Sequence, residues 1–372
     1  MELKRRVWVE VDLGKLRGNY AKIAAAVKPA KVLCVLKANA YGLGVMPYAQ
    51  ALGATDCAGF GVAEPFEALQ LAGCGKPVQI LSSILPDEIE PMVAAGVALP
   101  VIDLATARLI DAAAKRLKTV AKVHFKLDTG MGRLGIPAAD APRVIRAVKR
   151  LGHLDCEGIF SHCPMAYDPS SPFTLEQIAT FRAILADAAK AGITFRKVHI
   201  AASDAINNFP QTAKRPFTQV RTGINLHGSF DPNGRRALNV EPVLTLKTRI
   251  AQVRDLPPGT TLGYGRTWCL AKRTRVATIS AGYADGLPLA LTNRGHVLIK
   301  GKPCPVIGRI SMDYTTVDAS LVPDAKPGDE VVCLGGKGPH AITPDDWGTL
   351  KGTHAYEIIC SLGNRVERRY VQ

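Results

Sequence analysis

The sequence lacks the long apolar segment that a membrane-spanning helix needs. No uninterrupted apolar run approaches the ~20 residues that cross a bilayer, although 47% of the 372 residues are hydrophobic. The segment 1–6 ends in basic residues and is followed by Trp8, Glu10 and Asp12, so no apolar signal-peptide core develops. We therefore expect a globular protein that stays in the cytoplasm and has no membrane partner.

Paired cysteines and nucleotide-binding glycines are also missing. The nine cysteines form an odd set without a C-x-x-C pair, and Cys34 and Cys333 lie inside apolar runs. This usage is typical of core residues in a reducing compartment, so we predict neither a disulfide framework nor a metal site. No G-x-G-x-x-G follows the first predicted strand, which argues against a doubly wound dinucleotide-binding sheet.

Acidic residues are too few to balance the basic ones. The chain has 32 Asp and Glu against 47 Lys and Arg, which gives a formal net charge of +15. The basic residues are scattered, with only short groups such as 4–6 and 272–273, and aromatic residues are not interleaved with them. We interpret most of this charge as solvated surface and predict no nucleic-acid partner.

Apolar runs and helical segments alternate through the first part of the chain. Strands are predicted at 32–36, 58–62, 77–81, 97–102, 122–127, 157–160, 197–200 and 219–224. Helical periodicity is present at 12–23, 104–117, 138–151 and 175–191. Eight such units fit the usual length of ~250 residues for a (β/α)8 barrel, so we predict a TIM-like barrel over residues 12–238.

The pattern changes beyond residue 239 to short strands separated by Gly and Pro. Strand-like runs occur at 243–253, 275–280, 296–299, 315–317, 330–333 and 366–370. They predict a C-terminal antiparallel β domain over residues 239–372. We expect the N-terminal strand 1–11 to pack with it, so the predicted fold class is α/β with a barrel followed by a β domain.

Lys37 follows a buried strand directly. The run 32–36 is apolar without alternation, as in a parallel sheet buried on both faces, and it leads Lys37 into a turn that contains Gly42. Barrel enzymes place their chemistry at this end of the strands. A lysine desolvated there has a lowered pKa and can bond covalently to an aldehyde. A lysine that extends its amine to water at a strand end is the alternative at this point.

Other polar side chains lie at the ends of the predicted strands or directly beyond them. They are Tyr41, Lys126, Asp128, Arg133, His162, His199, Ser203 and Arg221. Because barrel active sites are assembled from such positions, we expect them to share one face. Ser203 and Gly223 near the last two strands predict a phosphate site. A lysine that bonds aldehydes beside an anion site indicates pyridoxal 5′-phosphate as cofactor.

Five motifs resemble, in order, those of the bacterial alanine racemases. They are Lys-Ala-Asn-Ala-Tyr-Gly at 37–42, Asp-Thr-Gly-Met-Gly-Arg-Leu-Gly at 128–135, Gly-Tyr-Ala-Asp-Gly at 282–286, Gly-Arg-Ile-Ser-Met-Asp at 308–313, and Tyr-Glu at 356–357. The resemblance spans nearly the whole chain. It implies a pyridoxal-phosphate-dependent racemase of L- and D-alanine that supplies D-alanine for peptidoglycan, and a homodimer whose active sites combine both chains.

The resemblance also implies roles for individual residues. Lys37 carries the cofactor and acts as one acid/base, and Tyr264 of the second subunit acts as the other. Arg221 faces the ring nitrogen of the cofactor and is oriented by His199, while His162 bonds the catalytic tyrosine.

Further roles concern the cofactor, the substrate and the entrance. The resemblance implies cofactor contacts from Tyr41, His199, Ser203, Gly223, Ile224 and Tyr356. It implies substrate contacts from Arg133 and Met312, entrance positions for Tyr283, Arg309 and Tyr356, and a lysine that is often carbamylated at Lys126.

Several positions depart from the family pattern and leave alternatives open. They are Leu43 for His, Ala202 for Asn, His227 for Tyr, Leu289 for Arg and Glu367 for Pro. The open alternatives are a racemase of serine or another small amino acid and a non-enzymatic pyridoxal-phosphate homeostasis protein. Decarboxylases of the same architecture pair the ring nitrogen with an acid, so Arg221 and Tyr264 argue against them.

Overall fold

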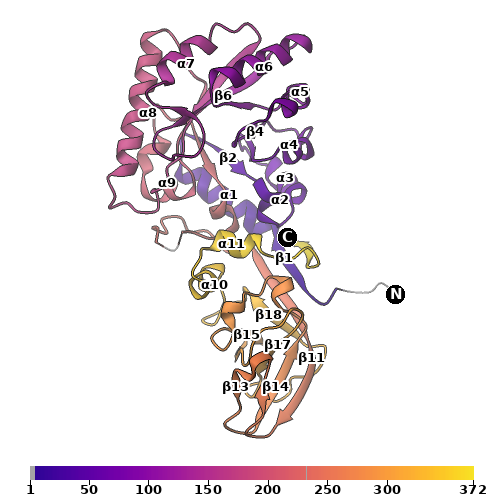
Figure 1. Cartoon of the computed structure of the whole chain (residues 1–372). Helices are drawn as coiled ribbons and strands as arrows, with labels where there is room; N and C mark the ends of the chain where they lie inside the picture. The colour runs from indigo at the N-terminus through magenta and orange to yellow at the C-terminus, as the bar shows by residue number, and fades with distance from the viewer. Residues whose placement is uncertain (1–4, 232) are drawn as a thin grey trace. The chain divides into compact units, whose positions relative to one another are not determined.

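The computed structural model describes residues 5–231 and 233–372 and divides the chain into two compact units (Figure 1). The barrel unit is Leu16–Val240. The β unit is Glu241–Gln372 together with the described part of Met1–Lys15. The predicted boundary between residues 238 and 239 lies close to this division. Residues 1–4 of the predicted strand 1–11 lie outside the described residues.

Parallel strands form the wall of the barrel unit. They are β2 (Lys31–Val35), β3 (Gly59–Val62), β4 (Val78–Ile80), β5 (Leu99–Val101), β6 (Ala121–Asp128), β8 (Leu154–Phe160), β9 (Lys197–His199) and β10 (Gln219–Thr222). They pair in the orders β10-β2-β3-β4 and β5-β6-β8-β9, and the short β7 (Ile136–Pro137) adds to β6.

Backbone hydrogen bonds join the two sets of strands. The N–H of Ile80 donates to the carbonyl of Ala98 (3.0 Å), and that of Thr218 donates to the carbonyl of Val198 (2.9 Å). These bonds close the ring of strands, so the predicted (β/α)8 barrel is confirmed. Every residue of β3, β4 and β5 is buried, which explains the absence of alternation in their sequences.

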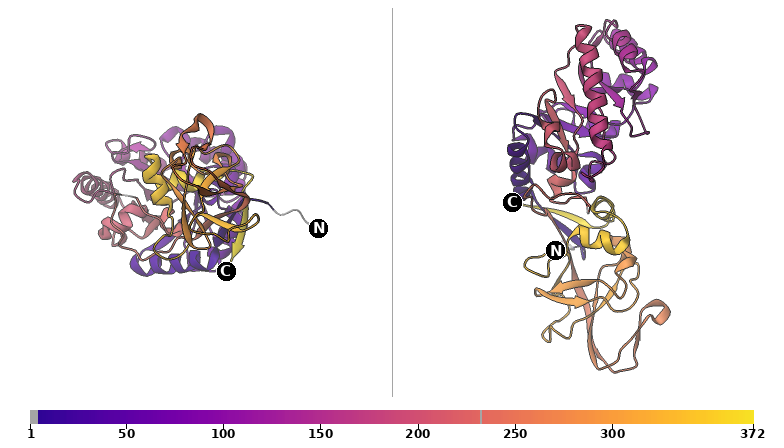
Figure 2. Two further views of the ribbon diagram at one scale, coloured as in Figure 1. Left: turned by 90° about the horizontal axis from the view of Figure 1, so that it is seen from below. Right: turned by 90° about the vertical axis from the view of Figure 1, so that its left-hand side faces the viewer.

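Helices cover the outside of this ring in the views of Figures 1 and 2. The main ones are α1 (Leu13–Ala26), α3 (Val45–Gly53), α4 (Pro65–Leu71), α5 (Ile89–Ala94), α6 (Leu104–Arg116), α7 (Ala141–Val148), α8 (Phe173–Lys190) and α9 (Ser203–Asn208). Asp12 precedes α1, and its side chain accepts from the N–H of Lys15 (2.8 Å), which caps the start of the helix. Helix α7 starts later than predicted, with Pro142 in its first turn.

The β unit is built on one large sheet. Its strands are β1 (Trp8–Asp12), β11 (Leu244–Leu256), β14 (Thr274–Ile279), β15 (His296–Ile299), β16 (Lys302–Pro305), β17 (Thr315–Asp318), β18 (Glu330–Leu334) and β19 (Glu367–Val371). A two-stranded hairpin, β12 (Thr261–Leu262) with β13 (Trp268–Cys269), precedes β14. The N-terminal strand β1 pairs antiparallel with β11, as expected for a strand that belongs to this domain.

Two features of the β unit differ from the sequence-based prediction. Strand β1 pairs with β19 in parallel, so the sheet is not antiparallel throughout. The unit also contains the short helices α10 (Pro344–Lys351) and α11 (Ala355–Cys360). Both are too short to give a clear helical period, although Thr343 and Asp346 form a capping box that marks the start of α10.

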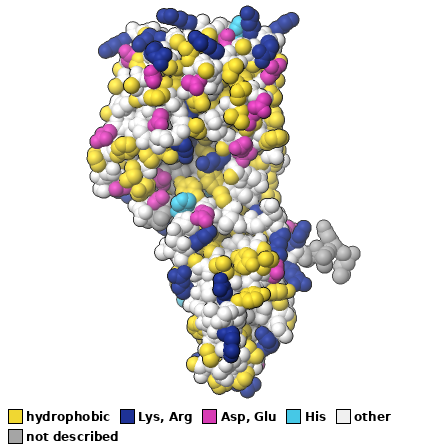
Figure 3. Space-filling view, viewed as in Figure 1, with side chains coloured by type: hydrophobic (Ala, Val, Ile, Leu, Met, Phe, Trp, Pro, Cys, Tyr) yellow, Lys and Arg dark blue, Asp and Glu magenta, His cyan; other side chains and the backbone are white. Residues whose placement is uncertain are grey.

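On the face shown in Figure 3, Lys and Arg side chains are interspersed with acidic and apolar side chains and do not form one continuous band. No helix in residues 5–231 and 233–372 combines the length and the apolar character that crossing a bilayer requires.

Candidate active site

Lys37 opens a left-handed turn, α2 (Lys37–Tyr41), immediately after β2. Residues 38–41 have φ angles of 54°, 54°, 53° and 59°. Each such residue costs roughly 1–2 kcal/mol relative to a right-handed conformation. Asn39 supports the turn, because its side-chain oxygen accepts from the N–H of Val45 (2.8 Å) and its own N–H donates to Glu67 (3.0 Å). Backbone strain held in this way is typical of functional sites.

The turn separates the environments of its two functional side chains. Tyr41 is buried, whereas Lys37 is exposed in the single chain. The prediction that the strand end itself desolvates Lys37 is therefore wrong. Strand β2 ends at Val35, and Lys37 is the first residue of the turn, where its side chain is exposed. The placement of Lys37 beyond the carboxyl end of a buried parallel strand is confirmed.

Arg221 on β10 is a buried cation held by neutral partners. Its Nη1 donates to Nδ1 of His199 (2.8 Å), and its Nη2 donates to the carbonyls of Ser161 (2.8 Å) and Ile200 (3.1 Å). Its Nη2 also lies 3.3 Å from Nδ1 of His162. Burial lowers the pKa of Arg221 to about 10, so the group stays cationic at neutral pH. The guanidinium therefore presents donors only.

The two histidines beside Arg221 are neutral. Burial lowers the pKa of His199 well below its usual value and, together with the charges of Arg221 and Arg133, lowers the pKa of His162 to about 3. Nδ1 of each ring therefore accepts from the guanidinium and Nε2 carries the proton. The ring of His199 also stacks on Phe160, with centroids 5.1 Å apart and planes within 3°. These contacts fix the orientation of Arg221.

Several cations converge at this end of the barrel. Lys126 is buried, and its Nζ donates to the carbonyls of Leu81 (2.6 Å) and Ser82 (3.2 Å). Burial, followed by the charges of Arg133, Arg221 and Lys37, lowers the pKa of Lys126 to about 8. At pH 7 about a tenth of an amine with this pKa is neutral. The carbonyl contacts suit the ammonium form, and carbamylation of Lys126 stays a prediction.

Asp128 shapes the loop that carries Arg133. Its carboxylate accepts from the backbone N–H groups of Gly130 (2.9 Å), Met131 (2.8 Å) and Gly132 (2.9 Å). These hydrogen bonds outweigh the opposing effect of burial and lower the pKa of Asp128. Gly130 and Gly132 have φ of 130° and 70°, which only glycine adopts readily. The motif at 128–135 is thus a self-bonded loop that presents an exposed arginine.

Hydroxyl groups and a glycine form a small cradle near the last two strands. The N–H of Gly223 donates to Oγ of Ser203 (3.2 Å), and a side chain at Gly223 would collide with the hydroxyl of Tyr41. Ile224 begins the single 3-10 turn η3 (Ile224–His227) directly after Gly223. The predicted phosphate residues are therefore together, and the absence of a side chain at Gly223 lets the hydroxyl of Tyr41 lie close to the backbone.

His227 was noted in the sequence only as a departure from the family pattern. Its ring is buried, lies 4.6 Å from the ring of Tyr41 between centroids, and its Nδ1 is 3.0 Å from the hydroxyl of Tyr48. Burial lowers its pKa to about 3. His227 thus packs against the ring of Tyr41. Its partner Tyr48 was not singled out in the sequence, because a tyrosine in a helix is usually an ordinary core residue.

Strand β8 of the barrel carries another charged group, Glu157, which was not singled out in the sequence. The carboxylate of Glu157 accepts a hydrogen bond from His124 Nε2 (3.2 Å) and forms an ion pair with Lys197 Nζ (2.9 Å). The hydrogen bond from His124, followed by that from Lys197, lowers the pKa of Glu157 to about 2 against the opposing effect of burial. His124 in turn packs edge-on against His199, with centroids 5.8 Å apart.

The remaining predicted site residues lie in the β unit. Tyr264 and Arg309 line a hollow of about 370 Å³ with Gly263, Ser311, Tyr314 and Thr316. Tyr283 and Met312 lie on two neighbouring segments, since the N–H of Tyr283 donates to the carbonyl of Ser311 (3.1 Å). Tyr356 lies on α11, where its ring contacts His354.

Comparison with known proteins identifies the family. Residues 11–231 match the model of the alanine racemase N-terminal domain and residues 243–370 that of the C-terminal domain. The alanine racemase of Geobacter sulfurreducens is 38% identical, with 97% of this chain and 96% of that protein covered. That of Symbiobacterium thermophilum is 36% identical, with coverage of 98% and 97%.

Solved structures give the same answer. The alanine racemase from Streptomyces lavendulae superposes with a TM-score of 0.93 at 33% identity, covering 100% of this chain and 98% of that one. The enzyme from Bartonella henselae, solved with covalently bound pyridoxal phosphate, gives a TM-score of 0.87 at 29% identity, with 99% and 100% covered. The resemblance seen in the motifs is confirmed, and the chain belongs to the alanine racemase family.

Proposed function

We propose that the protein is a pyridoxal-phosphate-dependent alanine racemase that interconverts L- and D-alanine and so supplies D-alanine for peptidoglycan. The observation that carries this proposal is the convergence of an exposed lysine, a buried guanidinium and a hydroxyl-lined cradle at one end of the barrel. Membership of the family supports it, as does the bound cofactor in the Bartonella henselae structure.

The residues present fit this cofactor. Lys37 offers the amine that bonds its aldehyde. Tyr41, Ser203, Gly223 and Ile224 would hold its phosphate, because the hydroxyl groups of Tyr41 and Ser203 both lie against the backbone of Gly223 at the start of a 3-10 turn. When bound, pyridoxal phosphate withdraws electrons from the substrate Cα and thereby acidifies its proton.

Arg221 would set how strongly that withdrawal acts. A guanidinium accepts no proton, so Arg221 would leave the ring nitrogen of the cofactor unprotonated if it faces that atom as the family resemblance implies. Arg221 would thereby limit the electron withdrawal that the cofactor supplies, which would favour prompt return of a proton to Cα. His199 keeps the guanidinium in place through its neutral Nδ1. This arrangement favours racemisation over transamination.

Two bases would act on opposite faces of Cα. The amine of Lys37 handles the proton of the D-isomer, and the phenol of Tyr264 handles that of the L-isomer, as the family resemblance implies. His162 would bond that phenol. The side chain of Tyr264 is 72% exposed in the single chain, which supports a homodimer in which each chain lends this tyrosine to the other.

Other residues would handle the substrate. Arg133 would bind the carboxylate of a small amino acid, with Met312 of the second chain beside it. Tyr283, Arg309 and Tyr356 would line the entrance. We place the enzyme in the cytoplasm and assign residues 12–238 to cofactor binding and residues 239–372 to the partner-facing β domain.

A direct assay tests this function. The purified protein, loaded with pyridoxal phosphate, is incubated separately with L-alanine, L-serine and a panel of other small amino acids, and both isomers are quantified by chiral chromatography. We expect alanine to racemise fastest, and borohydride reduction to attach the cofactor to Lys37 as seen by peptide mass spectrometry. Faster racemisation of serine would show that serine, and not alanine, is the preferred substrate. Bound cofactor without any racemisation would indicate the homeostasis role instead.

A further inference from the structure

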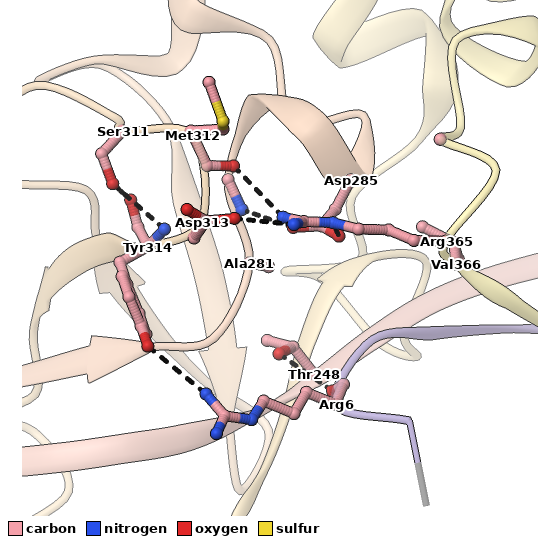
Figure 4. Close-up of polar contacts among 12 residues, drawn as sticks. Arg6, Thr248, Ala281, Asp285, Ser311, Met312, Asp313, Tyr314, Arg365 and Val366 are labelled. Atoms are coloured by element: carbon pink, nitrogen blue, oxygen red, sulfur yellow. Dashed lines mark hydrogen bonds and ion pairs between the residues drawn. The ribbon is translucent and has the colours of Figure 1, made fainter.

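Arg365 joins two segments of the β unit that follow different strands. Its Nε and Nη2 donate to the two carboxylate oxygens of Asp285 (2.7 and 2.9 Å), and its Nη1 donates to Asp313 (2.7 Å), as Figure 4 shows. The planar guanidinium is suited to this task because it presents donors in a rigid fork.

Asp285 belongs to the first segment, 282–286. Its side chain is buried and also accepts from the N–H of Gly282 (3.0 Å). A buried carboxylate without a charged partner is strongly unfavourable, so Arg365 neutralises it. The contact between Arg365 and Asp285 would by itself be enough to neutralise this buried carboxylate.

Asp313 belongs to the second segment, 311–314, and half of its side chain is exposed. The carbonyl of the preceding Met312 also accepts from Arg365 Nη2 (3.4 Å). An exposed ion pair adds little to global stability. The contacts of Arg365 with Asp313 and with the carbonyl of Met312 therefore fix local geometry more than they stabilise the fold.

The backbones of the two segments are also joined directly. The N–H groups of Tyr283 and Ala284 donate to the carbonyls of Ser311 and Met312, both at 3.1 Å. A side chain at Gly282 would collide with the carbonyls of Ser311 and Met312, so glycine allows this close approach. The segments thus behave as one block, and each presents a large side chain to solvent: Tyr283 is 44% and Met312 51% exposed.

We propose that Arg365 is a positioning residue for the reaction: it holds Tyr283 and Met312 at one fixed separation, so that the edge offered to the substrate pocket of a second copy has a single geometry. This inference rests on the proposed function. Arg365 itself touches neither substrate nor cofactor in this account, and it acts through Asp313 and the carbonyl of Met312.

Three variants of the cofactor-loaded protein test the proposal. Arg365→Lys keeps the charge but loses the fork, Asp313→Asn keeps the buried pair with Asp285, and Arg275→Lys is the control. Arg275 makes comparable contacts in the same unit, to Asp255 (3.1 Å) and the carbonyl of Ala325 (2.9 Å), away from both segments. The readouts are hydrogen–deuterium exchange of peptides covering 281–287 and 311–315, KM and kcat for alanine, and the melting temperature.

A positioning role predicts a defined pattern. Exchange in both peptides should rise at least about threefold in Arg365→Lys, since local opening requires only the loss of these contacts. KM should rise about three- to tenfold while kcat stays within about twofold, because substrate contacts are loosened and the proton-transfer groups are not. Asp313→Asn should show the same changes at smaller size, and Arg275→Lys should show none.

The outcomes separate the two proposals. If the unmodified protein racemises alanine but Arg365→Lys and Asp313→Asn match Arg275→Lys in exchange and KM, the positioning role is overturned. If Arg365→Lys does not fold, Asp313→Asn decides. If the unmodified protein does not racemise any amino acid, the proposed function fails, and unchanged exchange in Asp313→Asn would overturn the local coupling as well.

Discussion

The barrel unit buries several of its functional side chains, whereas those of the β unit are more exposed. In the barrel unit, His199 and Arg221 are 0% and 5% exposed and bond to one another. In the β unit, Tyr264 and Met312 are 72% and 51% exposed. The barrel therefore sets the charge state of these two groups through the packing of its own chain, whereas the β unit leaves Tyr264 and Met312 exposed in the single chain.

This difference has a physical basis. His162, Lys126 and Arg221 are surrounded by other parts of the closed barrel, so they are desolvated and their pKa values are lowered, whereas Lys37 and Arg133, which lie on turns, remain exposed. The groups of the β unit lie on turns, which remain at the surface. Large apolar and aromatic side chains exposed together indicate a binding surface, and the proposed second copy would cover it.

The largest effect should come from removing the covalent anchor in the barrel. We expect Lys37→Ala to lower racemisation by at least about 10³-fold, because the amine is both anchor and base. Borohydride should no longer fix the cofactor to the chain. Lys31→Ala is the control, since Lys31 lies on the same strand and only forms an exposed contact with Asp56 (3.5 Å). Comparable activity in the two variants would show that the barrel does not provide the anchor.

An intermediate effect should come from filling the cradle. Gly223→Ala adds a methyl group that collides with the hydroxyl of Tyr41, so we expect the dissociation constant of pyridoxal phosphate to rise by about tenfold or more. Ser203→Ala removes one hydroxyl group and should raise this dissociation constant by a smaller factor. Titration of the apoprotein with cofactor measures both. Gly18→Ala, which meets nothing within 4 Å, is the control. An unchanged constant for Gly223→Ala would place the phosphate elsewhere.

The smallest effect concerns acid stability, which should distinguish the two units. His227 has a pKa of about 3 in the fold against 6.5 when unfolded, so the unfolded state binds more protons below pH 6.5. The stability from the neutral ring is fully present above about pH 6.5 and is lost by about 1.4 kcal/mol per pH unit as the pH falls toward 3.

Urea unfolding between about pH 7.5 and 5 tests this. His227→Phe should be less stable at neutral pH, because Tyr48 loses its partner, but its free energy of unfolding should fall less steeply with pH. His340→Gln in the β unit changes an exposed ring and should keep the original slope. An unchanged slope for His227→Phe would mean that its ring is not neutral in the fold.

Much of the fold could be predicted because it depends on local periodicity. Each of the eight predicted barrel strands has a counterpart in the structure. The parallel pairing of β1 with β19 could not be predicted, because it joins segments from opposite ends of the chain. Helices α10 and α11 escaped notice because a helix of six or eight residues shows barely two turns of its period.

The members of the candidate site could be predicted better than their environments. Strand-end positions identified Lys37, Arg221 and Ser203. The exposure of Lys37, which the sequence left open as the alternative to a desolvated amine, depends on a left-handed turn over residues 38–41 that the sequence did not predict. The contact of His227 with Tyr48 likewise depends on tertiary packing, as does the link from Arg365 to two separate loops.

Subunit complementation tests most directly whether the β unit serves the barrel of another copy. Lys37→Ala and Tyr264→Phe are each expected to be nearly inactive, the latter chiefly with L-alanine, and are mixed in equal amounts after reversible dissociation. Shared sites predict recovery to about a quarter of the unmodified activity per chain, because half of the dimers are mixed and each of these has one intact site. Activity in the mixture no higher than the average of the two variants alone would contradict the account.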